Sequence, residues 1–296
     1  MNLDLLKSHP YISQDIKIEK FNDPYSYIVI DNLFKEDIYQ AICDKFHTYI
    51  SRCPGSFGEV GETGLTYDAF IYGVHKEDCT TGYDFFISKL WKTFLSNALD
   101  VELNKYMAYS LHFHKGSKEK PSKNGWPHLD LNICAHIQND QDEIHIVDDC
   151  NYADDTCNLQ PNTKKIVRSI AMLYYFNNKK DLEEGDGGGT GLFKNSKLES
   201  LVKEVKPINN RLFAFEVSPK SHHAFIGAKF DRSAMVNWFH SSPSYIVNKK
   251  LDLYKERYAQ TNQVFEYWAK NNIWTLDKDL DYFKFFDKPY DELFKK

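Results

Sequence analysis

The chain has 296 residues, of which 42% are hydrophobic and 15% aromatic, and this is enough apolar material to bury the core of one large domain with additions. Positive and negative residues are mixed along it and leave a net charge of -5, so the sequence lacks a basic field and we expect no nucleic-acid partner. It has no apolar run of about 18 residues for a membrane span and no signal-peptide pattern at its start, so we expect a cytoplasmic protein without membrane association.

The six cysteines are scattered along the chain without a CxxC pair, which fits reduced thiols better than a disulfide framework or a zinc site. They are Cys43, Cys53, Cys79, Cys134, Cys150 and Cys157.

The first part of the chain, residues 1–105, is predicted to supply a strand and helices that pack on the core. The β-branched and aromatic residues of Tyr25–Ile30 predict a strand. Apolar residues then recur at helical spacing over 33–50, which predicts a helix covering one face of a sheet. A second amphipathic helix is predicted over Asp84–Leu103.

From 106 to 240 the sequence changes to short segments of alternating polarity, separated by turns. Many short strands in series favour a β-sandwich or barrel, here with the earlier helices packed outside it. The segments are 106–114, 128–137, 166–176, 211–217, 221–227 and 232–240.

Two loops interrupt this β region. Residues 115–125 carry four lysines, which indicates either a solvated loop or a mobile rim that attracts an anionic substrate. The long acidic insertion 139–165 is typical of a functional lid or a disordered segment.

The last part of the chain, residues 241–296, is predicted to be a helical extension. A helix is expected over Asn248–Trp274, followed by an end rich in aromatic residues. These aromatic residues could dock on the barrel or on a second subunit, so we consider a homodimer as one arrangement.

The segment GWPHLDLN places His128 and Asp130 two residues apart in an alternating stretch. Side chains at i and i+2 of a strand leave the same face, so the imidazole and the carboxylate would enter one pocket. Such a pair supplies two of the three ligands in a 2-His-1-carboxylate iron site. The second histidine has two candidates, His222 and His223, of which only one can face inward because they are adjacent.

The order of motifs along the chain resembles the 2-oxoglutarate and Fe(II)-dependent oxygenases, in particular their prolyl-4-hydroxylase-like branch. Ser221, His223 and Phe225 of this chain fit the Ser-x-His-x-Val segment of that family, and Arg232 with Trp238 fits its final strand. The motifs are HLD, YFN, GDGGGTGLF, NRLFAF, HHAF and RSAMVNWF, in that order, within residues 106–240. The resemblance implies a double-stranded β-helix (jelly-roll or cupin-like) core.

The same resemblance implies the site. It makes His128, Asp130 and His223 the catalytic metal ligands, with Fe(II), 2-oxoglutarate and O2 as cofactor and co-substrates. It places Arg232 at the distal carboxylate of 2-oxoglutarate, where a bidentate, permanently charged partner is favoured over lysine.

The chain departs from the family pattern at two places. A tyrosine that many relatives carry before the lysine loop falls at Phe113, so a phenol for the 2-oxoglutarate site would have to come from Tyr109 or Tyr175. The serine that relatives carry after the arginine is absent or shifted in Arg232-Ser233-Ala234.

The implied reaction is hydroxylation of an aliphatic C–H bond, coupled to oxidative decarboxylation of 2-oxoglutarate to succinate. For the substrate we expect a small polar metabolite, such as an amino acid or a sugar, with a protein side chain as the alternative. A non-catalytic metal-binding β-barrel module is the competing class.

Overall fold

The computed structural model describes residues 6–51, 69–116, 119, 124–130, 133–137, 145–146, 163–242, 245–246 and 249. Most of the insertion 139–165 and of the lysine loop, and nearly all of the C-terminal extension with its predicted helix, lie outside these residues. The predicted domain boundaries therefore stay predictions. Within the described part, no helix is long and apolar enough to span a bilayer, and Cys43 and Cys79 are free thiols.

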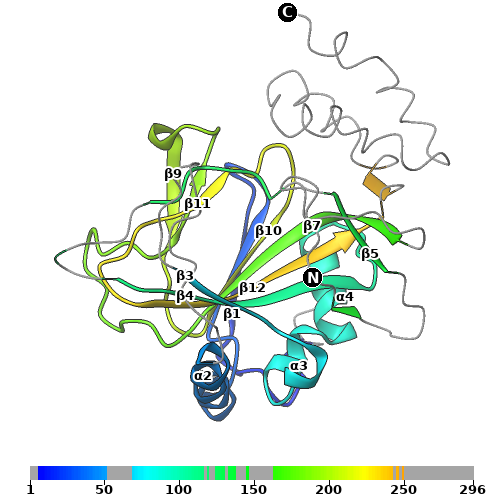
Figure 1. Cartoon of the computed structure of the whole chain (residues 1–296), viewed down its shortest axis with the longest axis horizontal. Coiled ribbons are helices and arrows are strands. Elements are labelled where there is room, and N and C mark those ends of the chain that lie inside the picture. The colour runs from blue at the N-terminus through cyan, green and yellow to red at the C-terminus, as the bar shows by residue number, and fades with distance from the viewer. Residues whose placement is uncertain are drawn as a thin grey trace, which may run out of the picture.

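Two β-sheets form the body of the molecule, and helices cover the outer face of the larger one (Figure 1). The larger sheet runs in the order β1 (Lys17–Phe21), β2 (Tyr27–Asp31), β10 (Arg211–Glu216), β7 (Thr163–Tyr175), β12 (Arg232–Ser241), β4 (Tyr106–His114), β3 (Ala69–Gly73). In addition, β5 (Ile133–Ile137) pairs with β7, and β6 (His145–Ile146) pairs with β4. The predicted fold class, a double-stranded β-helix core with flanking helices, is confirmed.

The smaller sheet has the order β11 (His223–Phe225), β8 (Thr190–Phe193), β9 (Leu201–Val205). A segment without regular structure, 124–130, runs beside β11. The amide of Gly125 donates to the carbonyl of Phe225 (2.8 Å), and His128 and His223 exchange two backbone hydrogen bonds of 3.0 Å. This pairing fixes the position of His128 relative to the smaller sheet.

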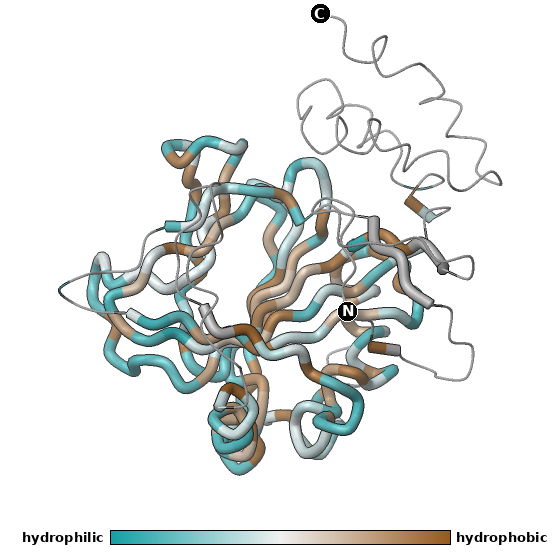
Figure 2. The backbone as a smooth tube through the Cα atoms, in the orientation of Figure 1, coloured by the Kyte–Doolittle hydropathy of each residue, from teal (hydrophilic) through white to brown (hydrophobic). Residues whose placement is uncertain are grey.

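The helices pack against the larger sheet through a continuous apolar layer. They are α2 (Glu36–Ile50), α3 (Tyr83–Phe86) and α4 (Lys89–Leu99). Figure 2 shows that the central strands are the most hydrophobic part of the backbone. Trp91 of α4 is fully buried in this layer, with its ring 5.2 Å from that of Phe85 and 5.3 Å from that of Phe94.

The helix predicted over Asp84–Leu103 is two helices. The chain leaves helical geometry at Ser88, whose extended backbone (φ -76, ψ 150) makes it the N-cap of α4. The second helix ends at Leu99 because Asp100 adopts the left-handed conformation (φ 55). Apolar periodicity continues across both breaks, so it could not reveal them.

The N-cap of α4 provides a test of local stability. The Ser88 side-chain oxygen accepts a hydrogen bond from the backbone N–H of Trp91 (3.1 Å). Ser88→Ala is expected to lower the free energy of unfolding by about 1 kcal/mol, because this N–H loses its acceptor. Urea unfolding would show a lower midpoint at an unchanged slope. Ser88→Asp keeps an acceptor and serves as the control; equal midpoints for the alanine variant and the unaltered protein would contradict the role of the cap.

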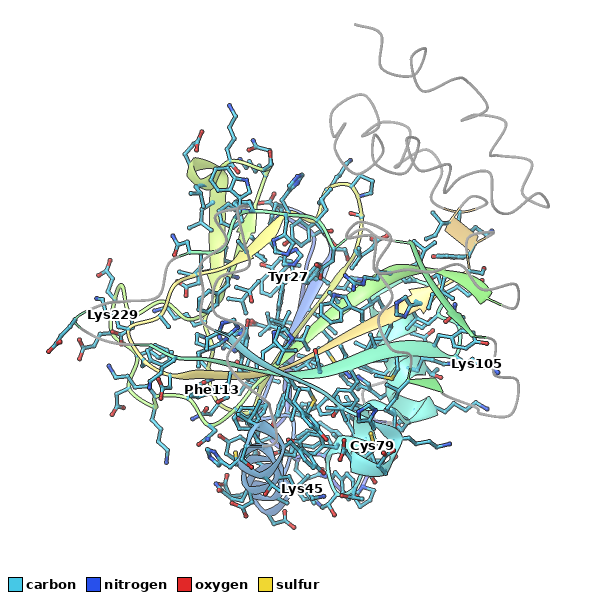
Figure 3. All side chains as sticks on the ribbon, in the orientation of Figure 1. Tyr27, Lys45, Cys79, Lys105, Phe113 and Lys229 are labelled. Atoms are coloured by element: carbon cyan, nitrogen blue, oxygen red, sulfur yellow. The ribbon has the colours of Figure 1, made fainter. Side chains whose placement is uncertain are left out.

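Side chains alternate between the two faces along β4, and this decides which residues reach the space between the sheets. Met107, Tyr109 and Leu111 belong to the apolar layer beneath the helices, whereas Tyr106 and Ala108 lie on the opposite face. Ser110, His112 and His114 continue the second series by the strand period of two. Figure 3 shows the side chains on both sides of the sheet, with Phe113 labelled toward α2 and Tyr27 between the sheets.

Candidate active site

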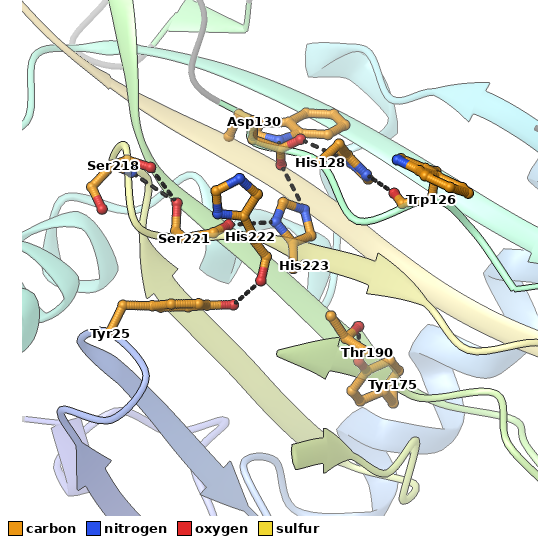
Figure 4. Close-up of polar contacts among 11 residues, drawn as sticks. Tyr25, Trp126, His128, Asp130, Tyr175, Thr190, Ser218, Ser221, His222 and His223 are labelled. Carbon is orange, nitrogen blue, oxygen red and sulfur yellow. Dashed lines mark hydrogen bonds and ion pairs between the residues drawn. The ribbon is translucent and has the colours of Figure 1, made fainter. Parts of the chain in front are cut away.

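Three side chains from two separate segments converge between the sheets (Figure 4). Asp130 lies between the two histidines, with Oδ1 3.6 Å from His128 Nε2 and Oδ2 3.5 Å from His223 Nε2. One ligand atom from each residue lies within 4.8 Å of the others. The side chains of Asp130 and His223 are 11% and 9% exposed, but that of His128 is 53% exposed, so the site opens to solvent beside His128.

Both imidazoles are oriented by their backbone contacts. His128 Nδ1 donates to the carbonyl of Trp126 (2.8 Å), and His223 Nδ1 donates to the carbonyl of Ser221 (3.0 Å). Since a carbonyl can only accept, the proton of each neutral ring lies on Nδ1 and Nε2 keeps its lone pair for a metal. Two Nε2 atoms and one carboxylate fit Fe(II) and leave coordination positions for further ligands.

The electrostatics of the three groups favour an ionised carboxylate. Burial opposes the charge of Asp130, but the neighbouring His223 and His128 hold the pKa of the carboxyl well below its usual range. Partial desolvation opposes the charged form of the half-exposed His128, but the hydrogen bond and charge of Asp130 outweigh it and raise the pKa of this imidazole. The carboxylate is therefore available as an anionic ligand throughout the neutral pH range.

The structure brings His223, and not His222, to His128 and Asp130. His222 is buried on the other side of the same chain segment, where its backbone carbonyl accepts a hydrogen bond from the Tyr25 hydroxyl (3.2 Å). Ser221 lies in a turn, where its hydroxyl donates to the carbonyl of Ser218 (2.9 Å). Strand alternation alone left both histidines open, and the Ser-x-His-x-Val resemblance favoured His223.

Arg232, at the start of β12, is 3% exposed. Its Nε donates to the carbonyl of Gly188 (3.1 Å), and its guanidinium lies 5.1 Å from the ring centre of Tyr175 and 5.4 Å from that of Phe225. Gly188 has a φ of +83, and a Cβ there would lie 2.9 Å from the ring of Phe230, so the turn that presents this carbonyl requires glycine. A buried guanidinium, with its planar fork of donors, suits the distal carboxylate of 2-oxoglutarate.

The two candidate tyrosines lie on different faces of the larger sheet, and only Tyr175 lies near Arg232. The Tyr175 hydroxyl shares a hydrogen bond of 2.6 Å with Thr190 Oγ1, and burial raises the pKa of Tyr175 although the charge of Arg232 opposes this, so the phenol keeps its proton for donation. Tyr109 is placed elsewhere. Its hydroxyl donates to the sulfur of Met235 (3.1 Å) beneath the helices, because the alternation of β4 turns it away from Arg232.

Two histidines that the sequence reading gave no role lie on the inner face. Burial, and after it the charge of Arg232, lowers the pKa of His112 to about 3, so this imidazole is neutral; its Nε2 shares a hydrogen bond of 2.9 Å with Ser110 Oγ. His114 stacks on the ring of Phe225 with centres 4.5 Å apart. The alternation of side chains along 106–114 could have shown that His112 and His114 share one face of the strand, the face toward the proposed 2-oxoglutarate site.

A cavity of about 300 Å³ lies beside β3 and β4. Trp238 forms part of its wall and also donates from Nε1 to Asp130 Oδ2 (2.6 Å), which connects the cavity to the three-residue site. Its walls are mainly apolar, and among the described residues around it there is no acid, lysine or arginine. The lining includes Ile71, Val74, Ile146 and Trp238, with Ser110, His112, His75 and Tyr109 as members that carry polar atoms.

Part of the chain matches a known protein family. Residues 134–240 match the family model described as the 2OG-Fe(II) oxygenase superfamily; the match includes His223 and Arg232 and begins after Asp130. A Pseudomonas putida prolyl-4-hydroxylase is 13% identical over 80% of this chain and 95% of its own, with a TM-score of 0.46. A Trichoplax adhaerens prolyl hydroxylase, solved with a peptide fragment of hypoxia inducible factor, is 15% identical over 79% and 87%, with a TM-score of 0.48. No curated protein matches the chain.

Proposed function

The chain belongs to the 2OG-Fe(II) oxygenase superfamily, and from this premise we propose that it hydroxylates an aliphatic C–H bond in a side chain of a peptide or protein. The observation that carries the proposal is the convergence of His128, Asp130 and His223 within 4.8 Å, with Asp130 hydrogen-bonded to Trp238 in the wall of a partly open, mainly apolar cavity. In this proposal the three residues bind Fe(II), and Arg232 with Tyr175 binds the distal carboxylate of 2-oxoglutarate.

Fe(II), 2-oxoglutarate and O2, when bound, supply the oxidising chemistry, in which a C–H group, 2-oxoglutarate and O2 give the alcohol, succinate and CO2. The residues of the chain orient the bound groups and shield them from solvent. The carbonyls of Trp126 and Ser221 hold the Nδ1 protons of the two imidazoles and keep both Nε2 atoms free of protons. Tyr175 and Arg232 can both donate to one carboxylate, which fixes the direction of the co-substrate.

The lining of the cavity favours a protein side chain as the substrate over the small polar metabolite that the sequence led us to expect. A sugar or a free amino acid would lose water from several polar groups on entering walls such as Ile71, Val74 and Trp238, without partners for most of them. A neutral apolar side chain would lose little, and Ser110 with His112 could satisfy one backbone or side-chain polar group. Its backbone could remain outside, toward the exposed side of the site.

A substrate screen tests this choice. The iron-loaded protein with 2-oxoglutarate is mixed with short peptides carrying a central proline, leucine or valine, or with free amino acids and sugars, and succinate is measured. We expect at least one peptide class to raise succinate formation several-fold over the substrate-free rate and to gain one oxygen atom by mass spectrometry. Stimulation by free sugars or amino acids alone would restore the small-metabolite hypothesis. Failure of iron and 2-oxoglutarate to bind together would favour the non-catalytic module.

A pair of variants tests whether the substrate found in this screen binds in the cavity. Ile71→Asp places a charge at its wall, where Ile71 is 37% exposed, and is expected to reduce peptide-stimulated succinate formation at least tenfold. Ile208→Asp makes the same change at a comparably exposed residue (42%) outside the cavity and is expected to retain the stimulation. Equal stimulation in both variants would exclude the cavity as the substrate subsite.

A further inference from the structure

The indole of Trp238 donates a hydrogen bond to Oδ2 of Asp130. This oxygen can bind either the indole N–H or the metal of the proposed site. Asp130 faces His128 with Oδ1 and His223 with Oδ2. The indole Nε1 donates to Oδ2 at 2.6 Å, a short distance for an N–H donor and typical of a bond to a charged acceptor. Asp130 lies in a segment without regular structure, so its side chain depends on such contacts for its orientation.

Trp238 is itself held on more than one side. It packs against a small apolar cluster that includes Ala108 and Ile166. The guanidinium of Arg168 lies 4.5 Å from the centre of its ring, within the range of a cation–π contact. Arg168 is 8% exposed, where such a contact is stronger than at the surface.

An irregularity in the larger sheet creates this stack. Phe239 pairs with Ile170, but the next residue of β12, His240, pairs with Arg168, so Ser169 is an extra residue on β7. In a regular strand, Arg168 lies two residues before Ile170 and would share its face, toward the helices. The bulge instead places Arg168 on the face of Trp238.

We propose that Trp238 is a positioning residue for Asp130, and that Arg168 fixes the indole for this task. The inference rests on the proposed function, because it presupposes that Asp130 is a metal ligand. The indole N–H occupies Oδ2 and leaves Oδ1 for the metal, so the carboxylate binds through one oxygen and a further coordination position stays open for the co-substrates. Outer contacts of this kind commonly change metal affinity ten- to a hundredfold when they are removed.

The test uses Co(II), a spectroscopic substitute whose visible absorption reports the coordination number, titrated into the metal-free full chain. Trp238→Phe keeps an aromatic ring under Arg168 but removes the N–H. We expect Co(II) affinity to fall roughly tenfold or more, and the visible absorption of bound Co(II) to change, because Oδ2 becomes free to bind the metal. Equal affinity with an unchanged spectrum would overturn the inference.

Trp126→Phe is the matched control. Its indole is 58% exposed, and the contact of Trp126 with His128 runs through its backbone carbonyl, which the substitution leaves in place. The same loss of affinity and the same spectral change in this variant would mean that any loss of a nearby indole disturbs the site, and would also overturn the inference.

Arg168→Met tests whether Arg168 fixes the Trp238 indole. It also keeps the proposal testable if Trp238→Phe does not fold. Loss of the cation from the indole face is expected to weaken Co(II) binding by roughly two- to fivefold, which corresponds to a cation–π contact. An unchanged Co(II) affinity would remove Arg168 from the arrangement. Failure of the unaltered protein to bind Co(II) would instead contradict the proposed metal site itself, so the two failures are distinguishable.

Discussion

Replacing any one of His128, Asp130 or His223 by alanine is expected to abolish iron-dependent turnover of 2-oxoglutarate and to weaken metal binding at least a hundredfold. Each substitution removes one donor from a three-donor site, and the remaining pair cannot hold the metal against water. Anaerobic titration with Fe(II), together with succinate measurement after addition of O2, gives both quantities. Unfolding curves verify that the fold is retained.

His222→Ala is the control for this series, because it removes an imidazole adjacent to His223 in the sequence. His222 is not one of the three converging ligands, and its backbone carbonyl, which accepts from the Tyr25 hydroxyl, is retained in alanine, so we expect iron affinity within about twofold of the unaltered protein. Loss of iron by His222→Ala with retention by His223→Ala would mean that the segment enters the site with the opposite register.

Arg232→Lys is expected to weaken 2-oxoglutarate binding about ten- to a hundredfold and to leave iron binding nearly unchanged. Lysine keeps the charge but loses the two-pronged geometry and the Nε bond to Gly188. Losing one charge-assisted hydrogen bond in a desolvated pocket costs roughly 1.5 to 3 kcal/mol. Titration of 2-oxoglutarate into the anaerobic Fe(II) protein, followed by the visible metal-to-ligand charge-transfer band, measures the affinity.

Arg211→Lys makes the same change at an arginine that already has an anionic partner. Arg211 forms two hydrogen bonds to the carboxylate of Asp31, of 2.5 and 2.8 Å, so we expect its substitution to leave 2-oxoglutarate affinity unchanged. An unaffected affinity in Arg232→Lys would show that another cation binds the co-substrate. A loss in Arg211→Lys equal to that in Arg232→Lys would show that the effect is general and not specific to the site.

Local periodicity was sufficient for much of the fold. Alternation predicted β4, β7, β10 and β12, and helical spacing predicted the layer that covers the larger sheet. These elements bury one continuous apolar face each, so their pattern survives in the sequence. Short strands such as β8 and β9 were not predicted, because four or five residues near glycines and lysines carry too little periodicity and obtain their hydrogen bonds only from partners distant in the chain.

The candidate ligands could be chosen from the sequence through the resemblance, but the way they converge required the tertiary structure. His128 and Asp130 were expected to lie in a strand over 128–137, whereas among the described residues of that stretch the strand is Ile133–Ile137 and Asp130 lies outside it. The two side chains converge because His128 pairs with His223 across an isolated bridge. That pairing joins segments nearly a hundred residues apart, and it brings to the site His223, the histidine that the Ser-x-His-x-Val resemblance favours over His222.

The sequence by itself determined which residue types were available to bind iron and 2-oxoglutarate, and in which order they occur. Only the tertiary structure decided which faces they occupy. Tyr109 and Tyr175 are equally good phenols in sequence, yet β4 turns Tyr109 toward the helices and β7 turns Tyr175 toward Arg232. The physical reason is that a strand has two equivalent faces until helices cover one of them. The bulge at Ser169, which reverses the face of Arg168, has likewise no signature in local polarity.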